Sequence, residues 1–289
     1  MGPFVPDLLN GKVVLITGGA TGLGRAMGEK FLALGAQLAI SGRREEVLQQ
    51  ASVELSSVGT AAVPVFYQSC DVRDPAAVQA LMDAVEGHFG HIDVLVNNAA
   101  GNFISPTERL SHRAVDAVLG TVLHGTFYTT LELGKRWIAQ GRSGTMLNIV
   151  TTYASSSSGS GYVVPSAAAK AGVLALTRSL AAEWAPHGIR QVAIAPGPFP
   201  TEGAWSRLMP TPEIEQRLIS RIPLGRVGDP EELANLAAYL ISDYAGYING
   251  EVVTIDGGEW LQGAGQFNGL ADVTDDQWNA LAALSRKGK

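Results

Sequence analysis

The sequence predicts an α/β fold, a doubly wound parallel sheet that forms a single domain of residues 1–289, and three observations predict it. Short apolar runs alternate with longer helical patterns, which is typical of a parallel sheet with helices on both faces. The chain has 289 residues, 46% of them hydrophobic, so it is long enough for one large core. A glycine-rich turn joins the first apolar run to the first helical pattern, and no linker divides the chain.

The individual strands and helices follow from this alternation. Short apolar runs predict buried strands at 12–17, 37–41, 63–70, 92–97, 145–151, 190–195 and 252–255. The longer patterns between them predict helices at 22–35, 45–57, 75–89, 114–140 and 166–185. Glu45 and Glu46 stand in the first turn of the second helix, where the helix dipole favours acids. Right-handed crossovers between these strands make the sheet doubly wound.

Two segments break the alternation of the core, which spans about residues 8–260. Residues 199–228 carry four prolines among apolar residues, a composition that predicts a helical lid over a substrate pocket. Residues 260–289 form a C-terminal extension, in which 275–286 has the pattern of a short amphipathic helix suited to packing on another subunit.

Composition excludes several classes of function. The net charge is −6 and no basic block is longer than Arg43-Arg44, so we expect no nucleic-acid partner. Cys70 is the only cysteine, which rules out an intramolecular disulfide and fits a reducing compartment. No apolar run reaches membrane-spanning length and the N-terminus lacks a secretory pattern. We therefore expect a cytoplasmic protein with no membrane association and no metal site.

The turn from Thr17 to Gly24 predicts a dinucleotide site. A pyrophosphate binds at a helix N-terminus, where free N–H groups and the helix dipole attract it. A Cβ at the closest positions would block that approach, so the turn needs glycine. The predicted contacts are Gly18, Thr21, Gly22, Leu23 and Gly24. The alternative is a tight turn without a ligand, which the strand–turn–helix context disfavours.

The end of the second predicted strand indicates which dinucleotide binds. An NAD site would place an acid there for the ribose 2′-hydroxyl, but residues 41–44 contain none. An arginine fork suits the 2′-phosphate of NADPH instead, so Arg43 is the predicted ligand, with Ser41 as a hydroxyl donor. The alternative is that Arg43 and Arg44 are both solvated surface charges.

Three motifs together resemble the short-chain dehydrogenase/reductase family over about residues 8–260: the turn Thr17–Gly24, the stretch 97–101, and Pro196-Gly197 after the sixth strand. The resemblance implies a Rossmann domain, a nicotinamide cofactor and a homotetramer. It also implies further cofactor contacts at Asp71, Val72, Asn98, Ala99, Ala100, Gly101, Lys170, Pro196, Gly197, Phe199 and Thr201.

The family's usual Tyr-xxx-Lys pattern is altered here. Ser166 stands four residues before Lys170, Tyr153 stands where the usual serine lies, and Val122 replaces the usual helix asparagine. One branch of the family has this swapped arrangement, the NADPH-dependent 2,4-dienoyl-CoA reductases of mitochondrial type. The runs 98–111, 162–172, 196–198 and 221–223 resemble that branch.

The resemblance implies a reaction and a set of residues. Hydride from NADPH adds to the δ-carbon of a 2,4-dienoyl-CoA, and protonation at the α-carbon gives 3-enoyl-CoA, a step in the β-oxidation of unsaturated fatty acids. Tyr153 and Asn102 would stabilise the dienolate oxygen, and Tyr153 would also supply or relay the proton. Lys170 would bind the nicotinamide ribose and favour the enolate by its charge, and Ser166 would assist Lys170 or the cofactor. The acyl-CoA contacts implied are Arg73, Phe103, Ser111 and Arg207.

Several alternatives stay open. Tyr153 could be a packed aromatic, with Tyr162 as the rival tyrosine; Asn102 could be a turn residue, and Ser166 the N-cap of its helix. A ketone or 3-oxoacyl reductase is a second possible function, although Ser166 and Val122 stand where that chemistry needs a tyrosine and an asparagine. A catalytically inactive NADPH-binding protein is a third.

Overall fold

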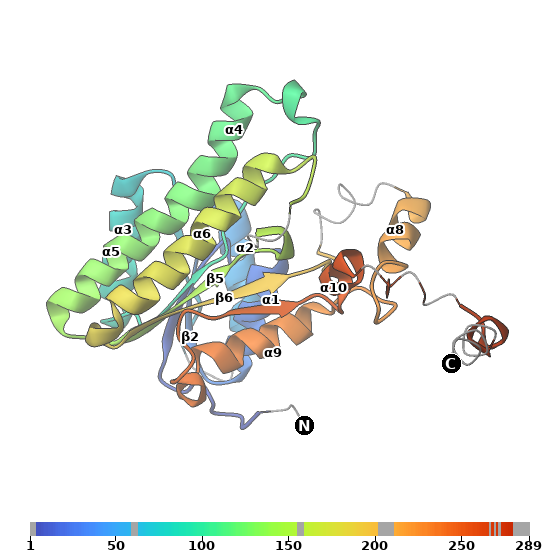
Figure 1. Cartoon of the computed structure of the whole chain (residues 1–289). Helices are drawn as coiled ribbons and strands as arrows, with labels where there is room; N and C mark the ends of the chain where they lie inside the picture. Colours follow the sequence, from blue (N-terminus) through green and yellow to red (C-terminus); the bar gives the residue numbers. More distant parts are fainter. Residues whose placement is uncertain are drawn as a thin grey trace.

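Seven parallel strands form one sheet in the order β3-β2-β1-β4-β5-β6-β7, with helices on both faces (Figure 1). The computed structural model describes residues 4–58, 63–154, 159–201, 211–265, 267–268, 270 and 273–279. The strands are β1 Val13–Thr17, β2 Gln37–Gly42, β3 Phe66–Ser69, β4 Val94–Asn97, β5 Gly144–Ile149, β6 Ile189–Pro196 and β7 Val252–Ile255. This architecture confirms the predicted doubly wound Rossmann-type sheet.

The helices divide between the two faces of the sheet. The α-helices are α1 Gly22–Ala33, α2 Glu45–Ser56, α3 Pro75–Phe89, α4 His112–Leu119, α5 Gly125–Gln140, α6 Val164–Glu183, α8 Pro212–Ile219, α9 Pro230–Ile241 and α10 Glu259–Ala264. Helices α1, α2 and α9 cover one face, while α3, α5 and α6 cover the other (Figure 1).

Side chains of the central strands alternate between two cores. Val14 and Ile16 of β1 pack with α1, α2 and α9, whereas Val13 and Leu15 pack with α3 and α5. Every residue of β1 is buried, because a parallel strand covered by helices on both faces has no solvent side. Apolar runs without polar alternation are therefore the correct signal for these strands.

The strand order also fixes where a ligand can bind. The chain winds from β1 outward to β3 and then returns to β4 on the other side of β1. The loops that follow β1 and β4 therefore leave the sheet toward opposite faces, which opens a crevice at their carboxyl ends.

The structure corrects several predicted boundaries. The strand predicted at 63–70 is confined to Phe66–Ser69, and the helix predicted from 166 begins at Val164. The helix predicted at 114–140 starts at His112 and contains a π-helical turn at Gly120–His124. Helix α9 was not predicted, although Asp229 and Glu232 form a capping box at its start.

The lid and the C-terminal extension are described in part. Helix α8 lies within the predicted lid, while residues 202–210 lie outside the described residues. Helix α10 begins the extension, and 275–279 are helical as predicted, while 280–289 lie outside the described residues. Within the described ranges, no helix is long and apolar enough to cross a membrane.

Candidate active site

The turn after β1 has the backbone shape that requires glycine. Gly18 and Gly22 adopt φ values of 65° and 57°, in the left-handed region. A Cβ on Gly24 would lie 2.3 Å from the Gly18 carbonyl oxygen and 2.5 Å from Asn98 Nδ2. The turn therefore packs directly against the first residue after β4, and α1 begins at Gly22 with its N–H groups at the sheet edge.

Asn98 and Thr17 lock this turn in place. The Asn98 amide donates to the carbonyl oxygens of Thr17 and Gly18, at 3.1 and 3.0 Å. The Thr17 hydroxyl accepts from the backbone N–H groups of Asn98 and Ala99, both at 3.1 Å. Asn98 therefore lies beside the predicted pyrophosphate turn. The anchoring role of the buried Thr17 was missed, because it depends on a neighbouring strand far away in sequence.

We expect Gly24→Ala to lower the free energy of unfolding by about 1–3 kcal/mol, because the new methyl group overlaps the Gly18 carbonyl. Gly87→Ala is the matched control: Gly87 lies in α3 with open space around it, and alanine there adds about 0.5–1 kcal/mol of stability. Urea unfolding of both variants measures the difference. Equal stability of the two would contradict the close packing of the turn.

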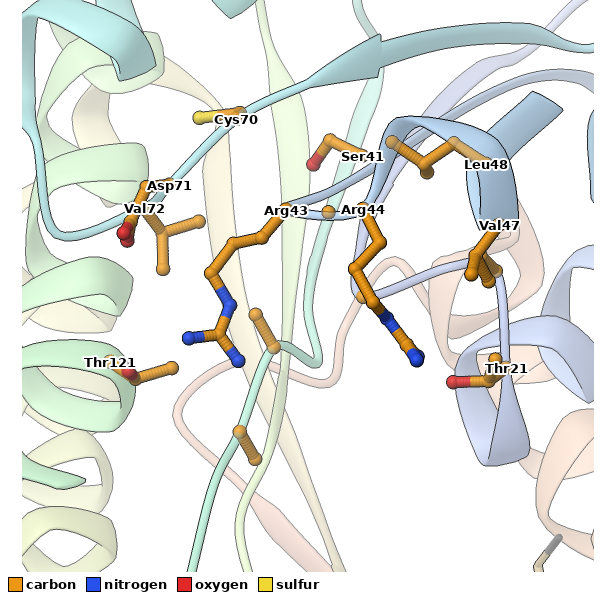
Figure 2. Close-up of a pocket in the computed structure, with 15 residues that line it drawn as sticks. Thr21, Ser41, Arg43, Arg44, Val47, Leu48, Cys70, Asp71, Val72 and Thr121 are labelled. Atoms are coloured by element: carbon orange, nitrogen blue, oxygen red, sulfur yellow. The ribbon is translucent and has the colours of Figure 1, made fainter. Parts of the chain in front are cut away.

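A cleft of about 700 Å³, open to solvent, lies beside the turn. It is lined by Gly18, Ala20, Thr21, Ser41, Gly42, Arg43, Arg44, Val47, Leu48, Cys70, Asp71, Val72, Ala99, Ala100 and Thr121. Figure 2 shows Arg43 and Arg44 extending from the end of β2 into this space, with Asp71 on the side of Arg43 and Thr21 on the side of Arg44. Eight of the predicted cofactor residues therefore line one cleft.

The polar groups of the cleft fit an adenosine with a phosphate. Ser41 Oγ is buried and has no hydrogen-bond partner among the described residues, so it is free to bind a ligand oxygen. Burial raises the pKa of the Cys70 thiol to about 11, so this thiol is uncharged at neutral pH. Arg43 and Arg44 supply positive charge at the end of β2, and residues 41–44 contain no acid.

Asp71 and Arg73 form an ion pair at the rim of the cleft. Arg73 Nε lies 2.9 Å from one Asp71 oxygen and 3.0 Å from the other. This guanidinium lowers the pKa of the Asp71 carboxyl, which therefore stays charged at neutral pH. The structure thus pairs Arg73 with Asp71, a predicted cofactor contact, and the role of Arg73 in binding CoA stays a prediction.

Tyr153, Ser166 and Lys170 come together at the carboxyl end of β5. Tyr153 lies in the 3₁₀ turn Thr152–Ala154 that follows the strand, and its hydroxyl is 3.3 Å from Ser166 Oγ. Ser166 and Lys170 lie one turn apart on α6, and both are buried. A tyrosine hydroxyl thus reaches Ser166 from another element of the chain.

Lys170 is held as a buried amine. Its Nζ donates to the carbonyl oxygen of Ile149, the last residue of β5. Burial lowers the pKa of Lys170 to about 8, because the charged form loses its hydration. The amine therefore titrates close to neutral pH, which is a property of groups at functional sites.

Comparison with known proteins agrees with this geometry. A family model described as enoyl-(acyl carrier protein) reductase matches residues 18–259. A Caenorhabditis elegans protein named as a probable 2,4-dienoyl-CoA reductase, (3E)-enoyl-CoA-producing, is 44% identical over 98% of this chain and 93% of its own. A Bacillus subtilis protein named as a probable 2,4-dienoyl-CoA reductase, (2E)-enoyl-CoA-producing, is 46% identical over 86% of this chain and 97% of its own.

A solved structure extends the comparison to three dimensions. A short-chain dehydrogenase from Bacillus anthracis is 44% identical, with a TM-score of 0.77 over 86% of this chain and 96% of its own. The chain belongs to the short-chain dehydrogenase/reductase family. It is therefore an oxidoreductase, and its fold implies a nicotinamide cofactor.

Within this short-chain dehydrogenase/reductase, the alternative role of Ser166 as a helix cap is wrong. Helix α6 has Val163 as its N-cap, so Ser166 lies inside the first turn with its hydroxyl toward Tyr153. Val122 lies in the π-helical turn, buried in a cluster with Ala169. An apolar contact therefore occupies the position at which the family usually has asparagine.

The structure places the other predicted substrate and catalytic residues outside the cluster of Tyr153, Ser166 and Lys170, or does not describe them. Asn102 and Phe103 are exposed, and the Asn102 side chain accepts from the Phe103 N–H at 2.8 Å, a turn contact. Ser111 is the N-cap of α4, where its hydroxyl accepts from the Ala114 N–H. Arg207 lies outside the described residues.

The segment after β6 returns toward the glycine turn. The Thr201 side chain lies 3.5 Å from the position of a Cβ on Gly22, so this segment reaches the start of α1. A Cβ on Gly197 would lie 2.6 Å from Asp256 Cβ, which explains the glycine after Pro196. The Phe199 ring is buried against Gly228, so only its backbone is free for the predicted cofactor contact.

A buried polar network beneath the site was missed. Asn97 and Asn148 face each other in register at the ends of β4 and β5, with Asn97 Nδ2 2.9 Å from Asn148 Oδ1. Thr129 donates to Asn97 Oδ1 at 2.6 Å, and Asn148 donates to Thr177 at 2.9 Å. This network joins α5 and α6 to the strand ends that carry Asn98 and Ile149.

Proposed function

We propose that this short-chain dehydrogenase/reductase uses NADPH to reduce 2,4-dienoyl-CoA to 3-enoyl-CoA, a step in the β-oxidation of unsaturated fatty acids. One observation carries the proposal: the Tyr153 hydroxyl lies 3.3 Å from Ser166, which occupies the usual tyrosine position four residues before Lys170. A carbonyl reductase needs that tyrosine on the helix as its general acid. Stabilisation of an enolate oxygen allows a donor from another direction.

Each residue has a definite task in this reaction. Bound NADPH supplies a hydride to the δ-carbon of the diene. Tyr153 and Asn102 donate hydrogen bonds to the thioester oxygen, on which negative charge develops. A proton from solvent, relayed by the Tyr153 hydroxyl, then adds to the α-carbon. Ser166 orients the Tyr153 hydroxyl, while the Lys170 amine binds the nicotinamide ribose and favours the negative charge. Water exclusion strengthens these contacts, because both Ser166 and Lys170 are buried.

NADPH, rather than NADH, is favoured by the end of β2. Arg43 and Arg44 extend into the cleft, the Ser41 hydroxyl beside them has no hydrogen-bond partner among the described residues, and residues 41–44 hold no acid that would bind the ribose 2′-hydroxyl of NADH (Figure 2). A guanidinium binds a phosphate through two charge-assisted hydrogen bonds.

We expect Arg43→Ala to raise the KM for NADPH by about 10- to 100-fold, since a hydrogen bond to a charged group contributes about 1.5–3 kcal/mol. The KM for NADH, which has no 2′-phosphate, should change by less than about threefold. Arg178→Ala, on the exposed face of α6, is the matched control and should change neither value. Equal effects of Arg43→Ala on both cofactors would exclude 2′-phosphate recognition.

Steady-state NADPH oxidation tests the reaction itself. We expect turnover of 2,4-decadienoyl-CoA without added flavin or metal, and 3-decenoyl-CoA as the product. Turnover of a 3-oxoacyl-CoA but not of the dienoyl-CoA would favour the second candidate, a carbonyl reductase. Absence of turnover with both, together with tight NADPH binding, would favour a catalytically inactive NADPH-binding protein. A 2-enoyl product would move the protonation from the α-carbon to the γ-carbon.

The same proposal includes assembly into a homotetramer. Phe127 and Leu131 lie four residues apart on α5 and are exposed, so one face of this helix presents apolar surface to solvent. Light scattering on the purified protein should give about four times the chain mass of 30.3 kDa. A mass equal to that of one chain would contradict it.

A further inference from the structure

A strained, exposed tyrosine lies next to the candidate active site. Tyr162 adopts φ 66°, the left-handed region, and is the one non-glycine residue of the described chain to do so. This backbone conformation is costly for a bulky side chain. The Tyr162 side chain is also 64% exposed, so burial in the protein does not offset that cost. Such strain is a feature of ligand-binding segments, where a bound molecule completes the packing.

One hydrogen bond joins Tyr162 to a second apolar segment. The Ser105 N–H donates to the Tyr162 carbonyl oxygen at 2.9 Å. This bond brings the loop after β4 against the turn before α6, and Figure 1 shows both segments above the carboxyl ends of the strands. Ile104 is 55% exposed and Phe103 is 48% exposed, so each of the two segments joined by the Ser105–Tyr162 bond carries an exposed apolar or aromatic residue next to that bond.

The occupant of this surface follows from its position. Asn102 immediately precedes the apolar pair, and Ser166, whose hydroxyl contacts Tyr153, lies four residues after Tyr162 on α6. The apolar surface is therefore continuous along the chain with the residues assigned to the thioester end of the substrate. Burial of an aliphatic chain is favourable, and an acyl chain that extends from the thioester can bury its apolar surface against Phe103, Ile104 and Tyr162.

We propose that Tyr162 is a specificity-determining residue, whose ring together with Ile104 covers the distal part of the acyl chain of the thioester substrate. This assignment rests on the proposed function for the substrate class. It gives Tyr162 a binding role and leaves the donor role with Tyr153. The Ser105–Tyr162 bond holds the ring in place through the strained turn.

Binding of saturated acyl-CoAs tests the assignment without any turnover. The variant is Tyr162→Gly, because glycine adopts φ 66° freely and preserves the turn. With NADP⁺ present, we expect the Kd for decanoyl-CoA to rise by about tenfold and the Kd for butanoyl-CoA by less than about twofold. Ile104→Ala should show the same dependence on chain length. Tyr247→Ala, fully exposed beyond α9, is the control and should change neither Kd.

Three results would overturn the assignment: equal rises for both thioesters, no change for either, or no binding of decanoyl-CoA to the wild-type protein. A loss of kcat in Tyr162→Gly with a short 2,4-dienoyl-CoA would make Tyr162 the donor instead. Failure of the proposed reaction would give a different result. The wild-type protein would then bind decanoyl-CoA, and the Tyr162→Gly variant would bind it more weakly, but neither would oxidise NADPH with a dienoyl-CoA. That result would support the binding role of Tyr162 and contradict the proposed reaction.

Discussion

Tyr153→Phe is expected to lower kcat with 2,4-decadienoyl-CoA by about 100- to 1,000-fold, the usual effect of removing one donor to a developing oxyanion. The phenyl ring keeps the packing of the 3₁₀ turn after β5 and removes only the hydroxyl that contacts Ser166. Tyr153 does not line the cleft beside the glycine turn, so the Kd for NADPH should stay within about twofold of wild type. Stopped-flow measurement of NADPH oxidation separates the two quantities.

Tyr247→Phe serves as the control for loss of a tyrosine hydroxyl, because Tyr247 is fully exposed and lies after α9, away from the site. Its kcat should equal that of the wild-type protein. Turnover near the wild-type rate in Tyr153→Phe would remove Tyr153 from the chemistry and return Tyr162 to consideration as the donor.

Lys170→Met is expected to abolish turnover and yet stabilise the protein free of cofactor at pH 7. Burial lowers the pKa of Lys170 from its ordinary 10.5 to about 8, a penalty on the charged form of about 3 kcal/mol. Loss of the hydrogen bond to the Ile149 carbonyl offsets about 1 kcal/mol of the gain. The variant should therefore unfold with a free energy about 2 kcal/mol higher than wild type in denaturant titrations.

The pH dependence of this difference gives a sharper test. Below pH 8 the lysine is charged in both folded and unfolded states, so the penalty is present in full. Between pH 8 and 10.5 the unfolded chain binds more protons than the folded one, so wild-type stability rises relative to the variant. Lys135→Met, on the exposed side of α5, should show no such trend. A difference between Lys170→Met and wild type that is independent of pH would show that Lys170 is not desolvated.

Local patterns in the sequence predict most of the strands and helices of the fold. The apolar runs predict the strands because buried parallel strands have no solvent face, and the glycine spacing of the turn reflects positive φ at Gly18 and Gly22. Helix α9 shows what was overlooked and could have been found, since Asp229, Glu232 and the apolar residues that follow are the usual signs of a helix start.

Contacts between segments that are distant along the chain could not be predicted from the sequence. The sequence spacing of Tyr153 and Ser166 does not predict their 3.3 Å contact, because spacing alone does not determine how the chain between two residues folds. The family resemblance assigned both residues to the catalytic set without implying that they touch. The bond from Lys170 to the Ile149 carbonyl depends in the same way on how α6 packs against β5. The pairing of Arg73 with Asp71 and the burial of Ser41 likewise follow from the assembled sheet edge.

The carbon that receives the hydride tests the central claim most directly. Purified protein is incubated with 2,4-decadienoyl-CoA and NADPH deuterated at C4 of the nicotinamide, and the product is analysed by NMR. We predict deuterium at C5 of the acyl chain and a double bond between C3 and C4. Deuterium at C3, or reduction of a 3-oxoacyl-CoA with no reaction of the dienoyl-CoA, would contradict the transfer of hydride to the end of a conjugated diene.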